Sequence, residues 1–174
     1  MDSRTPESGL ARAAQPAAAD AGDNGAPGGR ALRMARGVCR FLAARGYSTL
    51  TEFPVGKGRR VDAIGLNREQ RFVIVEIKTT LADFRSDSKW PDYLLWCDTY
   101  YFAVPDGFPA DILPEDQGLL AADAFDAAII REAPVRPMNA TRRRTQILKF
   151  ALAAGQRLQQ TLDPGPAERW GTRS

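Results

Sequence analysis

Asp62, Glu76 and Lys78 are charged residues that stand in strongly apolar, β-branched sequence. Residues 51–78 predict three short strands joined by two tight connections, because β-branched runs alternate with turns that contain glycine and asparagine. The last of these runs has no polar face, as expected for a strand in a sheet that is covered on both sides. Charges in such a strand are costly unless something pairs with them. The three residues are therefore candidates for chemistry.

The expected strand register adds a third carboxylate to the pair. A three-residue loop at 56–58 sets Glu52 opposite Asp62, and a second turn centred on Glu69 sets Asp62 opposite Glu76. Side chains directly opposite each other on neighbouring strands share a face, with Cβ atoms about 5 Å apart. The three carboxylates would then form one row across three strands.

Such a row of carboxylates predicts a bound cation, because the like charges repel one another unless a positive ion lies between them. Ligand sets made only of oxygen suit Mg²⁺ or Mn²⁺ better than zinc. Lys78 lies two residues on from Glu76, on the same face of the strand. The alternative is a structural ion-pair network, in which Arg60 and Lys78 offset two of the three negative charges.

Composition narrows the possible chemistry further. The chain has 174 residues, enough for one domain with a proper core, and a net charge of only +3. It contains no histidine, which excludes a histidine base, a histidine metal ligand and a Ser-His-Asp triad. Its two cysteines, Cys39 and Cys97, are too few for a zinc cluster or a disulfide framework, so a reducing, cytoplasmic compartment is expected. No segment is long and apolar enough to span a membrane.

The domain is expected to span residues 30–162, between disordered tails at 1–29 and 163–174. Apolar residues recur at helical steps in 30–45 and in 140–162, and neither segment contains an acidic residue. The expected apolar stripes are Leu32, Ala35, Val38, Cys39 and Leu42 in the first helix, and Ile147, Leu148, Ala151, Gly155, Leu158 and Leu162 in the second. The basic residues of these helices either contact the phosphates of a DNA backbone or form a solvated face.

Other segments complete the expected sheet. Pro91 fits the first turn of a short helix that ends near Trp96, and residues 99–104 form a strongly β-prone run. Residues 118–122 and 127–131 are expected to pair as a hairpin.

Asp62 is followed, after thirteen intervening residues, by Glu76-Ile77-Lys78. This pattern resembles the catalytic signature of the PD-(D/E)XK nuclease superfamily, in its form without a proline before the aspartate. A longer set of residues between about 30 and 160 resembles the MmcB family, whose members are described as candidate DNA-repair endonucleases. That set comprises Arg59-Arg60-Val61-Asp62, Val75-Glu76-Ile77-Lys78, Asp83-Phe84, Asp87, Lys89-Trp90, Tyr93, Cys97-Asp98 and Tyr101-Phe102-Ala103-Val104-Pro105.

The resemblance implies an α/β fold with a restriction-endonuclease-like core. This core would be a mixed β-sheet of four to six strands, with a basic N-terminal helix, a short middle helix and a long C-terminal helix. It also implies Mg²⁺ or Mn²⁺ held by Asp62, Glu76 and the backbone carbonyl of Ile77, with Glu52 as a third carboxylate ligand or a group that orients the water. Asp62, Glu76, Lys78 and Glu52 are thus the candidate catalytic residues.

Several residues are candidates for contact with DNA. Lys89 and Tyr93 resemble the Gln-x-x-x-Tyr signature of RecB-type nucleases, with lysine in place of glutamine, and Trp90 would either stack on a base or pack beneath the site. The full candidate set is Lys57, Arg59, Arg60, Lys89, Trp90, Tyr93, Arg142, Arg143 and Arg144.

Together these features predict a metal-dependent DNA endonuclease that acts in DNA repair, with DNA and other DNA-repair proteins as partners. The alternative is a catalytically silent DNA-binding or adaptor module of a repair complex that keeps the nuclease-like fold. A purely structural protein is a third alternative, and it leaves the basic helices unexplained. The preferred DNA structure, endo- or exonucleolytic cleavage, the number of metal ions and the oligomeric state stay open.

Overall fold

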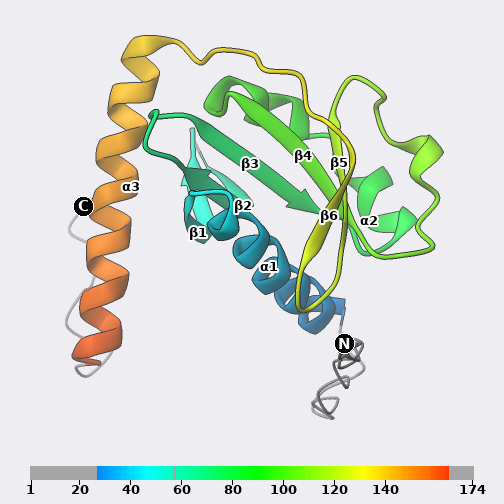
Figure 1. Cartoon of the computed structure of the whole chain (residues 1–174), viewed down its shortest axis with the longest axis horizontal. Helices are drawn as coiled ribbons and strands as arrows, with labels where there is room; N and C mark the ends of the chain where they lie inside the picture. Colours follow the sequence, from blue (N-terminus) through cyan, green and yellow to red (C-terminus); the bar gives the residue numbers. More distant parts are fainter. Residues whose placement is uncertain (1–26, 57, 165–174) are drawn as a thin grey trace, which may run out of the picture.

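The computed structural model describes residues 27–56 and 58–164 of the chain. Within this part, six strands form one mixed sheet in the order β1-β2-β3-β4-β5-β6 (Figure 1). β1, β2 and β3 are antiparallel, β3, β4 and β5 are parallel, and β5 and β6 form the expected hairpin. The strands are β1 (Ser48–Val55), β2 (Arg59–Leu66), β3 (Phe72–Ile77), β4 (Thr99–Val104), β5 (Gly118–Ala122) and β6 (Ala127–Arg131). The expectation of a mixed sheet with four to six strands is confirmed.

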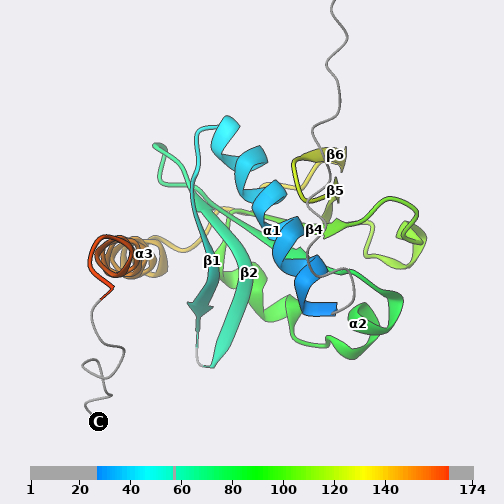
Figure 2. The same ribbon diagram turned by 90° about the horizontal axis from the view of Figure 1, so that it is seen from below.

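Helices lie on both faces and at one side of this sheet. α1 (Pro27–Ala44) crosses one face, whereas α3 (Ala140–Leu162) stands beside β1 and is seen end-on in Figure 2. α2 (Leu81–Ser86) and the 3₁₀ helix η1 (Trp90–Trp96) occupy the connection between β3 and β4, and the short 3₁₀ helix η2 (Ala110–Ile112) precedes β5. No helix in 27–56 or 58–164 combines the length and the apolar character that crossing a membrane requires.

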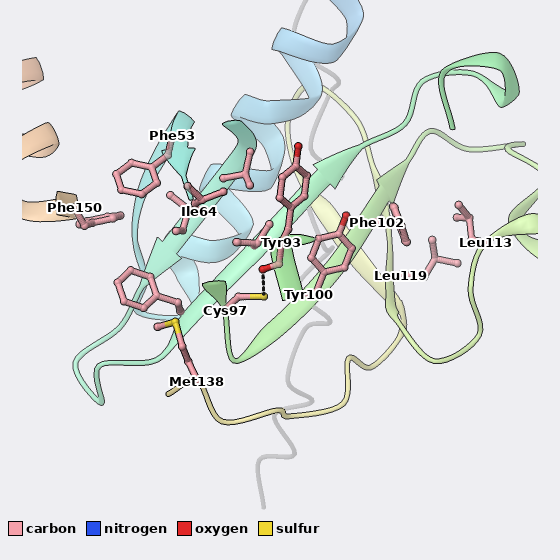
Figure 3. Packing of buried hydrophobic residues seen from close by; sticks show 14 of the residues in the cluster. Phe53, Ile64, Tyr93, Cys97, Tyr100, Phe102, Leu113, Leu119, Met138 and Phe150 are labelled. Atoms are coloured by element: carbon pink, nitrogen blue, oxygen red, sulfur yellow. Dashed lines mark hydrogen bonds between the residues drawn. The ribbon is translucent and has the colours of Figure 1, made fainter. Parts of the chain in front are cut away.

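Two apolar clusters fill the two faces of the sheet. Under α1, small and β-branched strand residues pack against the helix. On the opposite face, aromatic residues dominate, and Phe150 of α3 packs against Phe53 and Phe72 at ring-centroid distances of 5.9 and 6.1 Å (Figure 3). β3 is buried along its whole length because both faces are covered, as its sequence predicts.

The first helix differs in detail from the expectation. It begins at Pro27, so residues 27–29 are helical rather than part of a tail, and the remaining tail residues 1–26 and 165–174 lie outside the described residues. Gly46 follows its end with φ of +82°, as the sequence indicates. The buried side of the helix includes Met34 and Phe41, whereas Leu32 is 54% exposed. The apolar stripe is therefore rotated from the expected one.

The last helix turns most of its expected apolar stripe outward, with Ile147 as the exception. Its bounds agree with the prediction, but Leu148, Leu158 and Leu162 are exposed, and Gln146 and Phe150 are buried instead. The apolar periodicity of this helix is real, yet it does not mark the side that contacts the sheet. The burial of Gln146 was not expected. Its side-chain amide is accommodated there because it donates a hydrogen bond to the Trp96 carbonyl at 2.5 Å.

Candidate functional site

The site lies where β2 and β3 separate. Backbone pairing between these strands ends at Ala63↔Val75, in the register that places Asp62 beside Glu76. Side chains then replace the ladder: the Ile77 N–H donates to Oδ2 of Asp62 at 2.8 Å, and the Asp62 N–H donates to Oε1 of Glu76 at 3.2 Å. The two carboxylates are adjacent because each satisfies a backbone donor on the other strand.

Glu52 is in the expected register but points elsewhere. The flanking pairs Thr51↔Ala63 and Phe53↔Val61 place it across from Asp62, yet its φ of +50° breaks the regular alternation of β1. Its carboxylate instead contacts Nε of Arg60 at 2.5 Å and is about half exposed. The expected row of three carboxylates therefore does not form, and this pairing matches part of the structural alternative.

Lys78 is buried and held by a residue that the candidate set omitted. Its ammonium lies 2.6 Å from Oδ2 of Asp87 and 3.9 Å from Oε2 of Glu76. The backbone of Lys78 is fixed too, because its N–H donates to the Ala103 carbonyl at 2.9 Å and so extends β3 alongside β4. Asp87 is the C-cap residue of α2. Its role could have been predicted from sequence, because it is one of the residues that resemble the MmcB family.

Burial makes these carboxyl groups resist ionisation. Desolvation, followed by the charge of Asp62, raises the pKa of Glu76 from 4.5 to about 9. Desolvation also raises the pKa of Asp62, against the hydrogen bond from the Ile77 N–H. At Lys78, desolvation acts to lower the pKa, but the hydrogen bond and charge of Asp87 raise it overall, so the ammonium stays charged.

The oxygen donors at this site are of the kind that a divalent cation prefers. Asp62, Glu76 and Asp87 lie near the Lys78 ammonium, and the pKa of Glu76 is raised by desolvation first and by the charge of Asp62 second. Across 27–56 and 58–164, however, no group of three or more His, Cys, Asp or Glu side chains is arranged to hold a metal ion. The residues that fit are the pair Asp62 and Glu76 together with the Ile77 carbonyl, since hard cations prefer oxygen.

Aromatic residues support the site from the core. Tyr93 is buried, and its hydroxyl donates to the Arg60 carbonyl at 3.2 Å. Trp90 packs against Tyr100 and Phe102, with ring centroids 5.9 and 5.4 Å apart. Trp90 therefore takes the packing alternative, and Tyr93 lies in the same cluster rather than on an open surface (Figure 3).

Arg143 differs most from its expected role as a phosphate contact. Its guanidinium grips the buried Asp98 with two hydrogen bonds of 2.7 and 2.6 Å, and it also donates to the Gln70 carbonyl. Burial acts to raise the pKa of Asp98, but Arg143 and the amides of Phe72 and Met138 lower it overall. Arg143 thus fastens α3 to the sheet, a correction whose cause is the buried acid at the start of β4.

The other basic candidates occupy different environments. Arg59 forms an ion pair with Asp92 at 2.7 Å, whereas Lys89 and Arg144 are exposed. Arg142 donates to the Leu95 carbonyl at 2.9 Å and lies over the ring of Trp96 at 5.1 Å; Lys57 lies outside the described residues.

One surface cavity lies away from the carboxylates. It measures about 310 Å³ and lies between the start of α1 and the ends of β4 and β5. Its lining includes Arg30, Met34, Pro105 and Asp106. The carboxylates are not part of this cavity; they lie where β2 and β3 separate, inside the sheet.

Fold and site together define an α/β protein whose mixed sheet carries a buried acidic pair and a lysine at one strand edge. The chain belongs to the MmcB-like family: the family model described as DNA repair protein MmcB-like matches residues 18–165. A solved structure of a protein of unknown function from Silicibacter pomeroyi is 43% identical, with a TM-score of 0.78, and the match covers 85% of this chain and 99% of that one. Among curated proteins, no match was found.

Proposed function

We propose that this chain is a metal-dependent DNA endonuclease of DNA repair, with a restriction-endonuclease-like PD-(D/E)XK core. The observation that carries the proposal is the adjacency of the partly buried Asp62 and the buried Glu76, with the Lys78 ammonium 3.9 Å from Glu76. A protein that only binds DNA has no evident use for three costly buried charges. The family description as a DNA repair protein supports DNA as the substrate.

In this proposal Asp62, Glu76 and the Ile77 carbonyl would hold Mg²⁺ or Mn²⁺. When bound, such an ion polarises a scissile phosphate and lowers the pKa of a bound water. Lys78 keeps its proton because Asp87 holds it, so it acts as a fixed positive charge beside the phosphate rather than as a base. Asp87 is a positioning residue, and Glu52 with Arg60 forms the exposed rim of the site.

Exposed basic residues would place the duplex without reading its sequence. Lys89 follows Asp87, whose Oδ1 accepts the Lys89 N–H at 2.9 Å, so its side chain emerges close to the Lys78–Asp87 pair. Arg144 is exposed in the first turns of α3. Contacts of these residues with phosphate would make DNA affinity depend on salt.

The second candidate is a catalytically silent DNA-binding or adaptor module. The observation in its favour is that the ion pairs Lys78–Asp87 and Arg60–Glu52 satisfy much of the charge at the site from within the chain. This candidate shares the salt-sensitive DNA affinity but predicts no phosphodiester cleavage.

The test is nicking of supercoiled, branched, damaged and single-stranded DNA with Mn²⁺ or Mg²⁺, and with a chelator as the negative control. Asp62→Asn, Glu76→Gln and Lys78→Met are expected to lower the rate by at least about 100-fold, by analogy with the loss of other preorganised charge-stabilising groups. Glu115→Gln, at an exposed position before β5, is the matched control.

Three outcomes separate the candidates. Metal-dependent nicking by the parent and by Glu115→Gln alone supports the enzyme. Salt-sensitive binding of DNA without cleavage on every substrate supports the adaptor. If the three site variants nick as fast as the parent, the residue assignment is wrong.

A further inference from the structure

α3 has two faces with different tasks. Its inward face carries Arg143, Gln146, Phe150 and Arg157, at the three- and four-residue spacing of one helix side. These residues dock the helix on the sheet, and Arg157 donates to the Thr51 carbonyl of β1 at 2.7 Å. This docking fixes which side of α3 is left facing outward.

The outward face carries an apolar stripe, interrupted by Gln159, that has no partner in the described residues. Leu148, Leu152, Leu158 and Leu162 are 61%, 58%, 60% and 76% exposed. At about 100° per residue, these leucines fall within roughly 120° of the helix surface, together with Ala151 and Gly155. We call these six residues the leucine stripe. Figure 1 shows the later turns of α3 extending past β1, with no described element beyond them.

The four leucines of the leucine stripe are placed symmetrically about Gly155, whereas the mirror position of Ala151 is Gln159. Leu148 and Leu162 each lie seven residues from Gly155, and Leu152 and Leu158 each lie three residues from it. An antiparallel helix of identical sequence, crossing at Gly155, would set Leu148 against Leu162 and Leu152 against Leu158 of the second copy. A sequence with this symmetry is self-complementary, which is what a twofold contact requires.

Gly155 is otherwise unexplained by the fold. A Cβ added at this position would meet nothing within 4 Å among the described residues, so no contact within 27–56 or 58–164 requires a glycine there. Glycine in a helix interior is unfavourable. A crossing point between two helices gives it a purpose, because the separation of helix axes depends on the side chains at the contact.

Charge at the ends of the helix agrees with an antiparallel arrangement. Arg144 is exposed and projects on the side of the leucine stripe, one turn before Leu148. In an antiparallel pair it would approach the C-terminal end of the other α3, where helix carbonyls and Asp163 are negative. A parallel pair would bring the basic first turns of the two helices together.

We propose that two copies of this chain pair through their leucine stripes, as an antiparallel, twofold contact centred on Gly155. The parts of the chain outside the described residues are poor alternative occupants. Their large apolar residues are Met1, Leu10 and Trp170, too few to match four leucines. The second copy matches the four leucines one for one.

The first test is the oligomeric state of the full chain without DNA, measured by sedimentation from low to high micromolar concentration. The parent is expected to be a dimer in reversible exchange with monomer. Leu152→Gln combined with Leu158→Gln is expected to raise the dimer Kd by at least about tenfold, since few residues carry most interface energy. Leu95→Gln is the control, because Leu95 is 56% exposed on η1, outside the leucine stripe. Circular dichroism checks that each variant folds.

The second test fixes the geometry by disulfide cross-linking in a Cys39→Ser background. Gly155→Cys is expected to cross-link with itself, and Leu148→Cys is expected to cross-link only when mixed with Leu162→Cys. Self-cross-linking of Leu148→Cys would show a parallel pair and overturn the arrangement. A parent that stays monomeric at all concentrations, or a double variant that dimerises as well as the parent, overturns the proposal.

Discussion

Replacing Glu76 with glutamine is expected to stabilise the protein at neutral pH. Its carboxyl is buried beside Asp62, and its pKa is raised to about 9 by desolvation first and by Asp62 second. An amide carries no charge, and its oxygen can still accept the Asp62 N–H that Glu76 accepts at 3.2 Å. Lys78 retains its closer partner, Asp87, at 2.6 Å. The change therefore removes a penalty and keeps the main contacts.

The expected size follows from proton linkage. The folded chain binds a proton at Glu76 more tightly than the unfolded chain, whose carboxyl has a pKa of about 4.5. The free energy of unfolding of the parent must then fall as the pH rises from about 4.5 to about 9. A pH of 7 lies about 2.5 units above the ordinary pKa of Glu76, and each pH unit over which only the folded chain holds the proton changes the free energy of unfolding by about 1.4 kcal/mol. Glu76→Gln should thus gain up to about 3 kcal/mol at pH 7 and almost nothing at pH 4.5.

The measurement is urea unfolding of the chelator-treated parent and variant at about pH 4.5 and about pH 8, followed by tryptophan fluorescence. Glu115→Gln, at an exposed position, controls for the loss of a carboxyl group elsewhere. The two midpoints should coincide at low pH and separate at high pH, with the variant above the parent. Equal pH dependence of parent and Glu76→Gln would refute the argument that burial of this carboxylate is costly.

Three further changes test the contacts that position the site. Arg143→Met should cost about 3 kcal/mol in urea unfolding, because it leaves the Asp98 carboxylate buried without its bidentate partner. Asp87→Asn should lower the pKa of the Lys78 ammonium, measured by NMR, because desolvation is then opposed mainly by Glu76 at 3.9 Å; an unchanged pKa would contradict the assigned role. Phe150→Ala should cost about 3–5 kcal/mol in thermal unfolding, since its ring fills the core between α3 and the sheet.

The central strands and their register could be predicted from sequence. The short turns fix the offset between strands, and a buried strand tolerates little slippage, so Asp62 and Glu76 meet as expected. The family could be predicted too, because the residues that resemble it are spread over most of the chain. These features depend on local spacing and on alternation, which a single sequence displays.

Other features depend on contacts between distant residues. Glu52 turns away because β1 adopts a positive φ there, and no turn residue announces it. The sequence does not distinguish Arg143 from its neighbours Arg142 and Arg144, because its partner Asp98 is 45 residues earlier in the chain. Periodicity predicted the apolar stripe of α3 but not its exposure, since it shows that a face is apolar and does not show what covers it.

Asp98 links α3 to β3 through hydrogen bonds to both elements. Its carboxylate accepts the N–H of Phe72, the first residue of the strand that carries Glu76, and also the N–H of Met138 just ahead of α3. Arg143 holds the same carboxylate from the helix, so a displacement of α3 must change the acceptor of Phe72. The hydrogen-exchange rates of the Phe72 and Met138 amides should therefore change together. Pairing of two chains along α3 would then change the stability of β3, the strand that carries Glu76.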